Sequence, residues 1–158
     1  MKTLIVYESK KGYTKSCAEQ IAGELGKTTV IVTAKMAYKE VLDQYDLVII
    51  GSAVYAGKVP SRIRKFCKVR SEELLNRPLA LFMCGTGEEF KDSYYEKNYP
   101  QSLLEHSLEK GWFGGLIVLN QHRGITKMVL SSILKGKQEL HVEKQENISG
   151  FVSSITGK

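Results

Sequence analysis

Five short, almost continuous apolar segments are the strongest constraint on the fold of this chain. They occupy residues 4–7, 29–32, 47–50, 79–83 and 116–119, and they consist mainly of Val, Ile and Leu. Apolar and polar residues do not alternate in them, and such runs are typical of strands that are buried on both faces of a sheet. The chain is therefore expected to build a sheet that helices cover from both sides.

Segments with helical spacing lie between these strands. They cover residues 18–25, 63–75, 103–108 and 148–155. In each segment the apolar residues fall on one face of a helix, and the third helix is expected to end at Gly111. Strands that alternate with helices predict parallel pairing and right-handed crossovers. The sequence thus predicts an α/β fold in three layers, with residues 1–158 forming a single domain.

Two further segments do not follow this alternation. Residues 85–100 are expected to form a long polar and aromatic loop, whose three tyrosines (Tyr94, Tyr95 and Tyr99) either form part of a substrate lid or pack on the surface. Residues 124–137 have the pattern of a short basic amphipathic helix. We expect this helix to pack its apolar stripe on the sheet; the alternative is weak peripheral contact with an anionic membrane.

Composition narrows the class of protein. The chain of 158 residues is 42% hydrophobic and 25% charged, as in soluble globular proteins, and its apolar runs are shorter than the roughly 20 residues of a membrane-spanning helix. The apolar run after Met1 is too short for a signal peptide, so a cytoplasmic protein is expected. Cys17, Cys67 and Cys84 are too few and too widely spaced for a disulfide framework or a metal site, so we expect three reduced, buried thiols and no metal.

The chain is basic. Its net charge is +6 and its isoelectric point is about 9.2, which favours an anionic partner such as a phosphate-bearing cofactor, an acidic protein, a lipid surface or nucleic acid. Nucleic acid is not expected, because the sequence has no matching motif.

Polar residues follow the first predicted strand, directly before a helix. This loop reads Ser9-Lys10-Lys11-Gly12-Tyr13-Thr14. It combines two hydroxyl groups and two ammonium groups with the free amides of a helix start, so it is a candidate anion site. It matches neither the Walker pattern nor the dinucleotide fingerprint and is suited to a single phosphate. An ordinary strand-to-helix turn is the alternative.

Small residues follow the third and fourth predicted strands. The third-strand loop contains Gly51, Ser52, Ala53, Val54, Tyr55, Ala56 and Gly57, and the fourth-strand loop contains Cys84, Gly85, Thr86 and Gly87. Glycines allow the backbone to approach a flat ligand closely, and the Tyr55 ring can cover one face of such a ligand. Ligands bind at the carboxyl ends of parallel strands, so the three loops predict a phosphate pocket beside a slot for a planar ring.

The three loops together resemble those of flavodoxin-like FMN-binding proteins. The family's phosphate loop reads roughly Ser/Thr-x-Thr-Gly-x-Thr, and residues 9–14 match it except that Lys11 replaces the usual threonine. Residues 46–52 and 54–57 match the third strand and the ring-binding loop. The resemblance covers nearly the whole chain and implies a flavodoxin-like three-layer sandwich, with a five-stranded parallel sheet in the order 2-1-3-4-5 and FMN as cofactor.

Within this superfamily, the chain is more similar to the flavodoxin-type protoporphyrinogen oxidases than to the classical electron carriers. Residues 113–115 and the extra helix near residues 127–135 match features of the oxidase branch. Classical flavodoxins are acidic, whereas this chain is basic. The extra segment is shorter than that of the oxidases.

The resemblance also implies roles for individual residues. Ser9, Lys11, Gly12, Tyr13 and Thr14 would hold the FMN phosphate, and the flavin ring would lie between the third-strand and fourth-strand loops. The backbone at residues 56–57 would face the flavin N5 and stabilise the one-electron reduced form, and nearby lysines would raise the flavin potential. The full set of expected cofactor-binding residues is Ser9, Lys10, Lys11, Gly12, Tyr13, Thr14, Ser52, Ala53, Val54, Tyr55, Ala56, Gly57, Cys84, Gly85, Thr86 and Gly87.

Three functions remain open on the sequence. The first is an FMN protein that exchanges electrons with a redox partner protein. The second is an FMN-dependent oxidoreductase that oxidises a small molecule, such as a porphyrinogen, and passes the electrons to a quinone. The third is a non-redox module such as a receiver domain, which we rank last because Glu8 has no acidic neighbour at the strand ends. No catalytic residue is assigned, although His122 is a candidate for contacting a substrate.

Overall fold

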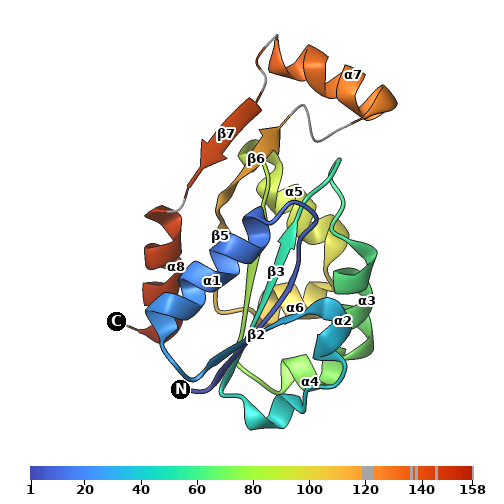
Figure 1. Ribbon diagram of the computed structural model, residues 1–158. Coiled ribbons are helices and arrows are strands. Elements are labelled where there is room, and N and C mark those ends of the chain that lie inside the picture. Colours follow the sequence, from blue (N-terminus) through green and yellow to red (C-terminus); the bar gives the residue numbers. More distant parts are fainter. Residues whose placement is uncertain (119–122, 136, 138, 145, 158) are drawn as a thin grey trace.

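A parallel sheet forms the centre of the computed structural model, which describes residues 1–118, 123–135, 137, 139–144 and 146–157. The five strands lie in the order β2-β1-β3-β4-β5 (Figure 1). They are β1 (Thr3–Glu8), β2 (Thr29–Thr33), β3 (Leu47–Ala53), β4 (Leu79–Cys84) and β5 (Lys110–Trp112). The predicted α/β class, the parallel pairing and the strand order are confirmed.

The central strands are buried on both faces. In β1, Leu4 and Val6 pack into one core layer and Ile5 packs into the other, and all three side chains are fully buried. β1 pairs with β2 on one side and with β3 on the other, so that Val6 lies opposite Val32 and Ile50. Because the side-chain period of a strand is two residues, a shift of one residue would exchange the two faces. The fit of particular side chains into the two core layers, rather than burial alone, therefore selects this register.

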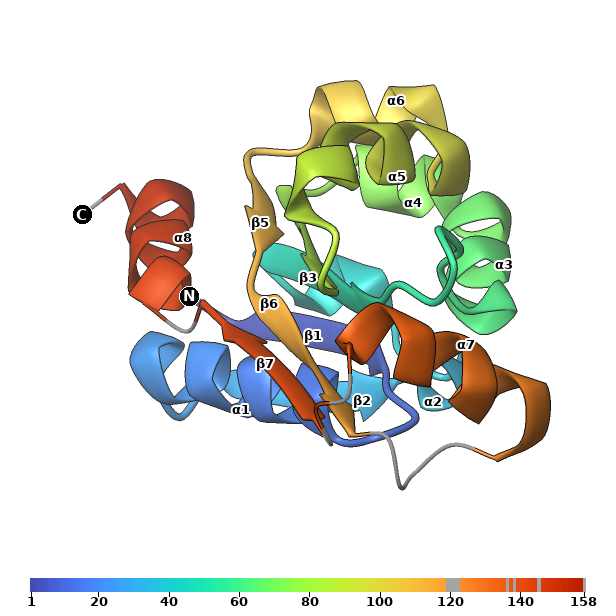
Figure 2. The same cartoon turned by 90° about the horizontal axis from the view of Figure 1, so that it is seen from above.

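Helices cover the two faces of the sheet. One face carries α1 (Tyr13–Leu25) and α8 (Glu146–Thr156). The other face packs against α2 (Ala34–Ala37), α3 (Ser61–Val69), α4 (Ser71–Leu75), α5 (Lys91–Asn98) and α6 (Gln101–His106). Single 3-10 turns occur at Leu42–Gln44 and Glu88–Phe90. Figure 2 shows α1 and α8 on one side of the sheet and α3 to α6 on the other.

Three predicted helix and loop boundaries are wrong. The expected helix over residues 63–75 is two helices, α3 and α4, which meet at Arg70. The expected third helix ends at His106, because the residues before Gly111 already lead into the edge strand β5. The expected long loop over residues 85–100 contains the Glu88–Phe90 turn and α5.

The sequence did not predict the helix α5, because the buried side of this helix is made of polar and aromatic residues. Tyr95 is 2% exposed and its hydroxyl donates a hydrogen bond to the Gly111 carbonyl oxygen at 2.7 Å. Asn98 is also buried. Contacts with the rest of the fold, which no local pattern of aliphatic residues reveals, hold this helix in place.

The predicted fifth strand over residues 116–119 does not belong to the parallel sheet. β6 (Gly114–Val118) pairs with β7 (Glu139–Glu143) in a separate antiparallel sheet, and residue 119 lies outside the described residues. The chain changes direction after β5, where Gly114 has a φ of +71°, a conformation that glycine adopts readily. The true edge strand β5 is short and contains Gly111, so its sequence pattern was inconspicuous.

The extra helix is confirmed, but its expected packing is not. α7 (Gly124–Leu134) lies between β6 and β7 and stands beyond the end of the parallel sheet (Figure 1). Leu134 is buried, but Ile125 is 81% exposed and Met128 is 70% exposed. The expectation that the apolar stripe packs on the sheet is therefore wrong for these two residues. Within the described residues, none of the helices has the length and apolar character needed to cross a bilayer.

A glycine in β3 provides a test of the central packing. A Cβ atom added to Gly51 would lie 2.0 Å from Cζ of Phe82, and overpacking of a filled core costs about 1–3 kcal/mol. Gly51→Ala should lower the free energy of unfolding, measured by urea denaturation, by at least about 2 kcal/mol. Gly23→Ala on the exposed side of α1, where the space is open, should instead raise it by about 0.5–1 kcal/mol. Similar effects of the two substitutions would contradict this account of β3.

A buried tyrosine makes the fold sensitive to alkali. Burial, followed by the hydrogen bond and negative charge of Glu40, raises the pKa of Tyr45 to about 12, whereas an unfolded tyrosine ionises near pH 10. Because the folded pKa is the higher one, this stabilisation is complete below about pH 10 and is lost as the pH rises to about 12. Tyr45→Phe should therefore flatten the decline of thermal stability over this range, as followed by circular dichroism. An unchanged decline would show that Tyr45 is not responsible.

Candidate functional site

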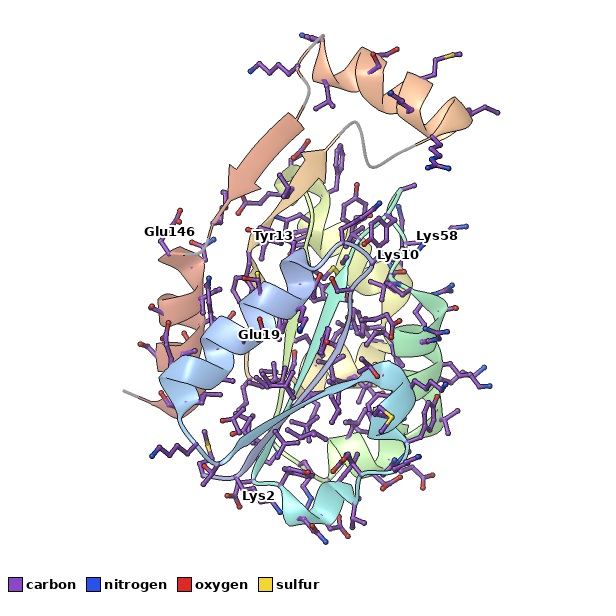
Figure 3. All side chains as sticks on the ribbon, in the orientation of Figure 1. Lys2, Lys10, Tyr13, Glu19, Lys58 and Glu146 are labelled. Atoms are coloured by element: carbon purple, nitrogen blue, oxygen red, sulfur yellow. The ribbon has the colours of Figure 1, made fainter. Side chains whose placement is uncertain are left out.

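The carboxyl ends of β1, β3 and β4 bring three loops together. β1 pairs with β3, and β3 pairs with β4, so that the residues after each strand emerge at one edge of the sheet. Figure 3 shows Lys10 from the first loop close to Lys58 from the second at this edge, and Tyr13 at the start of α1. Ligands of parallel sheets bind in this position. The sequence-predicted residues of the first, third and fourth strands thus share one region.

The first loop forms a tight turn before α1. Gly12 has a φ of +91°, in the left-handed region that favours glycine. Its amide donates a hydrogen bond to the Ser9 hydroxyl oxygen at 3.0 Å, and its carbonyl oxygen accepts one from the Ser16 amide at 2.9 Å. These two hydrogen bonds fold residues 9–12 against the start of the helix.

The start of α1 has the properties of an anion site. In this described part of the chain, no side chain caps the helix, and its first turn contains no acidic residue. First-turn amides make no hydrogen bonds within an α-helix, and the helix dipole favours negative charge there. The Thr14 hydroxyl is buried and, among the described residues, has only the weakly hydrogen-bonding Cys84 thiol beside it. A buried polar group of this kind is costly unless a ligand satisfies it, so this loop fits a phosphate.

Aromatic residues connect the first loop to its neighbours. The Lys10 ammonium lies 5.0 Å from the centroid of the Tyr55 ring, within the range of a cation–π interaction. The Tyr13 hydroxyl donates a hydrogen bond to the Phe113 carbonyl oxygen at 2.7 Å. Burial is the main cause that raises the pKa of Tyr55, so its hydroxyl stays neutral. Lys11, the departure from the family pattern, is exposed.

The second loop closes in a two-residue turn. Tyr55 and Lys58 exchange backbone hydrogen bonds of 2.9 and 3.0 Å. Between them, Ala56 has a φ of +48° and Gly57 has a φ of +74°, and two successive positive φ angles define a type I′ turn. An L-residue in the left-handed region costs about 1–2 kcal/mol, so the surrounding contacts must hold Ala56 in this conformation.

One buried side chain, that of Asn98, holds this turn, and it is not among the site residues predicted from the sequence. The Asn98 amide nitrogen donates to the carbonyl oxygens of Gly57 and Tyr94, at 2.9 and 2.8 Å. The Asn98 amide oxygen accepts from the Val59 backbone at 2.9 Å. Asn98 lies at the end of α5, the helix that the sequence did not predict. A polar residue between the buried Tyr95 and Tyr99 was the only available signal.

Two aromatic rings form a wall beside the second and third loops, which follow β3 and β4. Tyr94 packs against Gly57 and Gly87, since a Cβ atom at either glycine would lie 3.2–3.3 Å from its ring or hydroxyl. The Tyr94 ring stacks on Trp112, with centroids 6.3 Å apart and planes 28° apart. Trp112 in turn leaves only 3.0 Å for a Cβ atom at Gly85. Larger residues at these glycines would push the loops away from the wall.

The other tyrosines do not form a lid. Tyr95 and Tyr99 are 2% and 5% exposed and belong to the core. Tyr94 alone is partly exposed and reaches the loops. Both alternatives considered from the sequence, a lid and packing on the surface, are therefore wrong for Tyr95 and Tyr99.

Some predicted site residues contribute main chain rather than side chain to this edge. The Ser52 hydroxyl lies 3.0 Å from the Tyr99 hydroxyl inside the core, and Ala53 is also buried. The Cys84 thiol points into the opposite core layer, where its sulfur lies 3.8 Å from that of Cys17. Burial and the neighbouring Cys17 raise the pKa of Cys84 well above its usual value, so Cys84 behaves as a packed thiol. Val54 and Thr86 are partly buried in their loops.

The remaining polar candidates lie outside the loops or outside the described residues. His106 is 2.6 Å from the Arg77 carbonyl oxygen, on α6. His122, considered as a substrate contact, is not among the described residues. Glu8 pairs with Arg62 at 3.0 Å. The part of the chain that the structure describes holds no cluster of three potential metal-binding side chains.

Removing the amide of Asn98 should loosen the second loop. Asn98→Ala leaves the buried Val59 amide without its partner, at a cost of about 1–3 kcal/mol. We expect limited trypsinolysis after Lys58 to accelerate by roughly tenfold or more, since about 1.4 kcal/mol of loop stability corresponds to a tenfold change in the open population. Mass spectrometry of the fragment that ends at Lys58 measures the rate. Gln101→Ala, which removes an exposed side-chain contact on α6, should leave cleavage unchanged, and equal rates in both variants would refute the role of Asn98.

Comparisons with known proteins agree with this architecture. Flavodoxin 1 from Bacillus cereus, solved in its oxidised form, shares 14% identity over 99% of this chain and 98% of its own, with a TM-score of 0.59. The flavodoxin from Fusobacterium nucleatum, solved with bound flavin mononucleotide, shares 12% identity over 99% and 98% of the two chains, with a TM-score of 0.55. A flavoprotein from Lactobacillus acidophilus NCFM, solved in complex with FMN, shares 20% identity over 70% of this chain and 92% of its own, with a TM-score of 0.53. At these identities the likeness shows the fold.

A family match comes from the sequence itself. No curated protein sequence matches the chain. The sequence model of the flavodoxin domain matches residues 4–142, which include the five strands of the parallel sheet except Thr3, the first residue of β1, and the three loops at the strand ends. The chain therefore belongs to the flavodoxin domain family.

Proposed function

We propose that this protein binds FMN at the three loops and transfers electrons through it. The observation that carries the proposal is the buried Thr14 hydroxyl, which lies at the uncapped start of α1 and, among the described residues, has only the weakly hydrogen-bonding Cys84 thiol beside it. The pairing of this anion site with the Tyr55 turn supports a ligand that has a phosphate at one end and a flat ring at the other. The FMN that was solved in two of the similar proteins has these parts.

The residues of the first loop would bind the phosphate. The Ser9 and Thr14 hydroxyls and the amides of residues 13 and 14 would supply donors without a metal ion, and donors to a charged group form the stronger hydrogen bonds. Lys10 and Lys11 are exposed at the same loop and add positive potential. A helix start with these side chains favours the doubly charged phosphate of FMN over the neutral terminal hydroxyl of riboflavin.

The second and third loops would orient the ring. When bound, FMN supplies one-electron and two-electron chemistry, and the protein positions and tunes it. The Tyr55 ring, which the Lys10 ammonium contacts, would pack against the flavin ring. On the opposite side, Gly85 and Gly87 have no side chains that would fill the space for it. Positive charge from Lys10 and Lys58 favours an anionic reduced ring, so we expect these lysines to raise the flavin potential.

Asn98 controls the main-chain carbonyl in the turn. The Gly57 carbonyl oxygen accepts a hydrogen bond from the Asn98 amide. A proton donor on a ligand at this turn would compete with Asn98 for that oxygen. This chain thus has a side chain of its own that sets how readily the carbonyl turns toward the site.

A threonine substitution tests the phosphate assignment. Thr14→Val keeps the shape of the side chain and removes the hydroxyl, and a hydrogen bond to a charged group contributes about 1.5–3 kcal/mol. FMN affinity should fall by roughly 10-fold to 100-fold in calorimetry, while riboflavin affinity stays the same. Thr28→Val, whose hydroxyl binds the Met1 carbonyl far from the loops, is the control. An unchanged preference for FMN in the Thr14 variant would contradict the assignment.

We propose a second candidate, an FMN-dependent dehydrogenase that oxidises a porphyrinogen and reduces a quinone. The observation that favours it is the β6–α7–β7 segment, which stands at the same end of the sheet as the loops (Figure 1). FMN-loaded protein mixed anaerobically with protoporphyrinogen and a soluble menaquinone analogue should then release fluorescent porphyrin. No increase over protein-free controls would leave electron transfer to a partner protein as the account.

A further inference from the structure

The most exposed apolar side chains of the described residues lie on α7. Ile125 is 81% exposed and Met128 is 70% exposed, ahead of Val69 at 60% on α3. These two residues are three positions apart and therefore lie on the same side of the helix. β6 and β7 carry α7 beyond the carboxyl ends of the parallel strands (Figures 1 and 2). An apolar pair is thus presented to the surroundings at the end of the sheet that holds the three loops.

Positive charge surrounds this apolar pair. Residues 123–137 contain Arg123, Lys127, Lys135 and Lys137 and no acidic residue, and all four cationic side chains are exposed. Lys10 and Lys58 add two more exposed cations at the same end of the molecule (Figure 3).

Among the acidic side chains that the structure describes at this end, two are paired. Glu88 forms an ion pair with Lys144, and Glu8 forms one with Arg62. Glu89 is exposed. Residues 123–144 carry five basic residues against two glutamates, Glu139 and Glu143 of β7, so the segment around α7 is basic.

An exposed apolar pair surrounded by cationic side chains favours an anionic lipid surface as the binding partner of α7. A helix with exposed apolar side chains and cationic flanks lies in the boundary between headgroups and acyl chains, and its affinity rises with anionic lipid. A protruding helix is convex, so its side chains enter a lipid layer without needing a preformed groove. We propose that α7 docks this protein onto anionic membranes, with Ile125 and Met128 entering the acyl boundary and the flanking lysines contacting phosphate headgroups.

The proposed docking places the three loops next to the membrane. Because α7 stands at the carboxyl ends of the strands, a bound flavin would face the lipid surface, and its electron partner would be a lipid-soluble acceptor such as a quinone. This consequence rests on the proposed FMN function, whereas lipid binding itself does not. The two can fail separately.

Vesicle sedimentation tests the proposal with the full chain. Equimolar phosphatidylglycerol and phosphatidylcholine should bind the protein, pure phosphatidylcholine should bind it far less, and added salt should weaken the binding. Each lysine near an anionic surface contributes about a fivefold change in affinity, so Lys127→Gln with Lys135→Gln should weaken it roughly 25-fold. Ile125→Ser with Met128→Ser should weaken it at least about tenfold. FMN affinity, measured in parallel, should stay unchanged in both variants.

Matched variants on α3 serve as controls. Val69→Ser and Lys68→Gln change an exposed apolar and an exposed basic residue away from α7 and should keep wild-type lipid binding. A tryptophan at position 128 (Met128→Trp) should be quenched by brominated lipid, whereas one at position 69 (Val69→Trp) should not. Failure to bind phosphatidylglycerol would overturn the proposal. Equal loss in the α3 variants, or dimerisation that Ile125→Ser abolishes, would also overturn it.

Discussion

Burial of the central strands on both faces is the constraint on which the rest of the structure depends. Side chains of β1 alternate between two core layers, and its parallel pairing with β3 fixes where both strands end. The loops after these strands therefore emerge at one edge in a fixed relation. The anion site at residues 9–14 and the turn at residues 55–58 lie close together because of this register, and the contact between the Lys10 ammonium and the Tyr55 ring joins them.

The loops themselves are held by side chains from one layer of the sandwich. Asn98 bonds the Gly57 carbonyl within the turn and the Val59 amide directly after it, and Tyr94 and Trp112 form the wall beside the glycines. These three residues lie on α5 and β5, at the edge of the sheet next to β4. The site is thus built from sheet-end loops that an adjacent helix keeps in shape. Such support is needed because Ala56 occupies a conformation that is unfavourable for a residue with a side chain.

Local sequence patterns were sufficient for the parts of the fold that are governed by local rules. Aliphatic runs predicted the buried strands, and the resemblance of residues 9–14 and 54–57 to a known family predicted the strand order. α5 was missed because its buried positions are Tyr95 and Asn98, whose value comes from hydrogen bonds to distant backbone groups. The fifth strand was misplaced because its three residues include one glycine, while the apolar run that follows Gly114 pairs with β7 instead. Equally, no periodicity shows that α7 leaves Ile125 and Met128 exposed, since exposure depends on where the hairpin points.

The central claim is that the first loop recognises a phosphate on a flavin. The most direct measurement is a fluorescence titration of the flavin-free protein with FMN and, in parallel, with riboflavin. Two or more hydrogen bonds to the phosphate, at about 1.5–3 kcal/mol each, predict that FMN binds at least roughly a hundredfold more tightly than riboflavin. Equal affinity for the two flavins would show that residues 9–14 do not bind the phosphate, and binding of neither would contradict the flavin site as a whole.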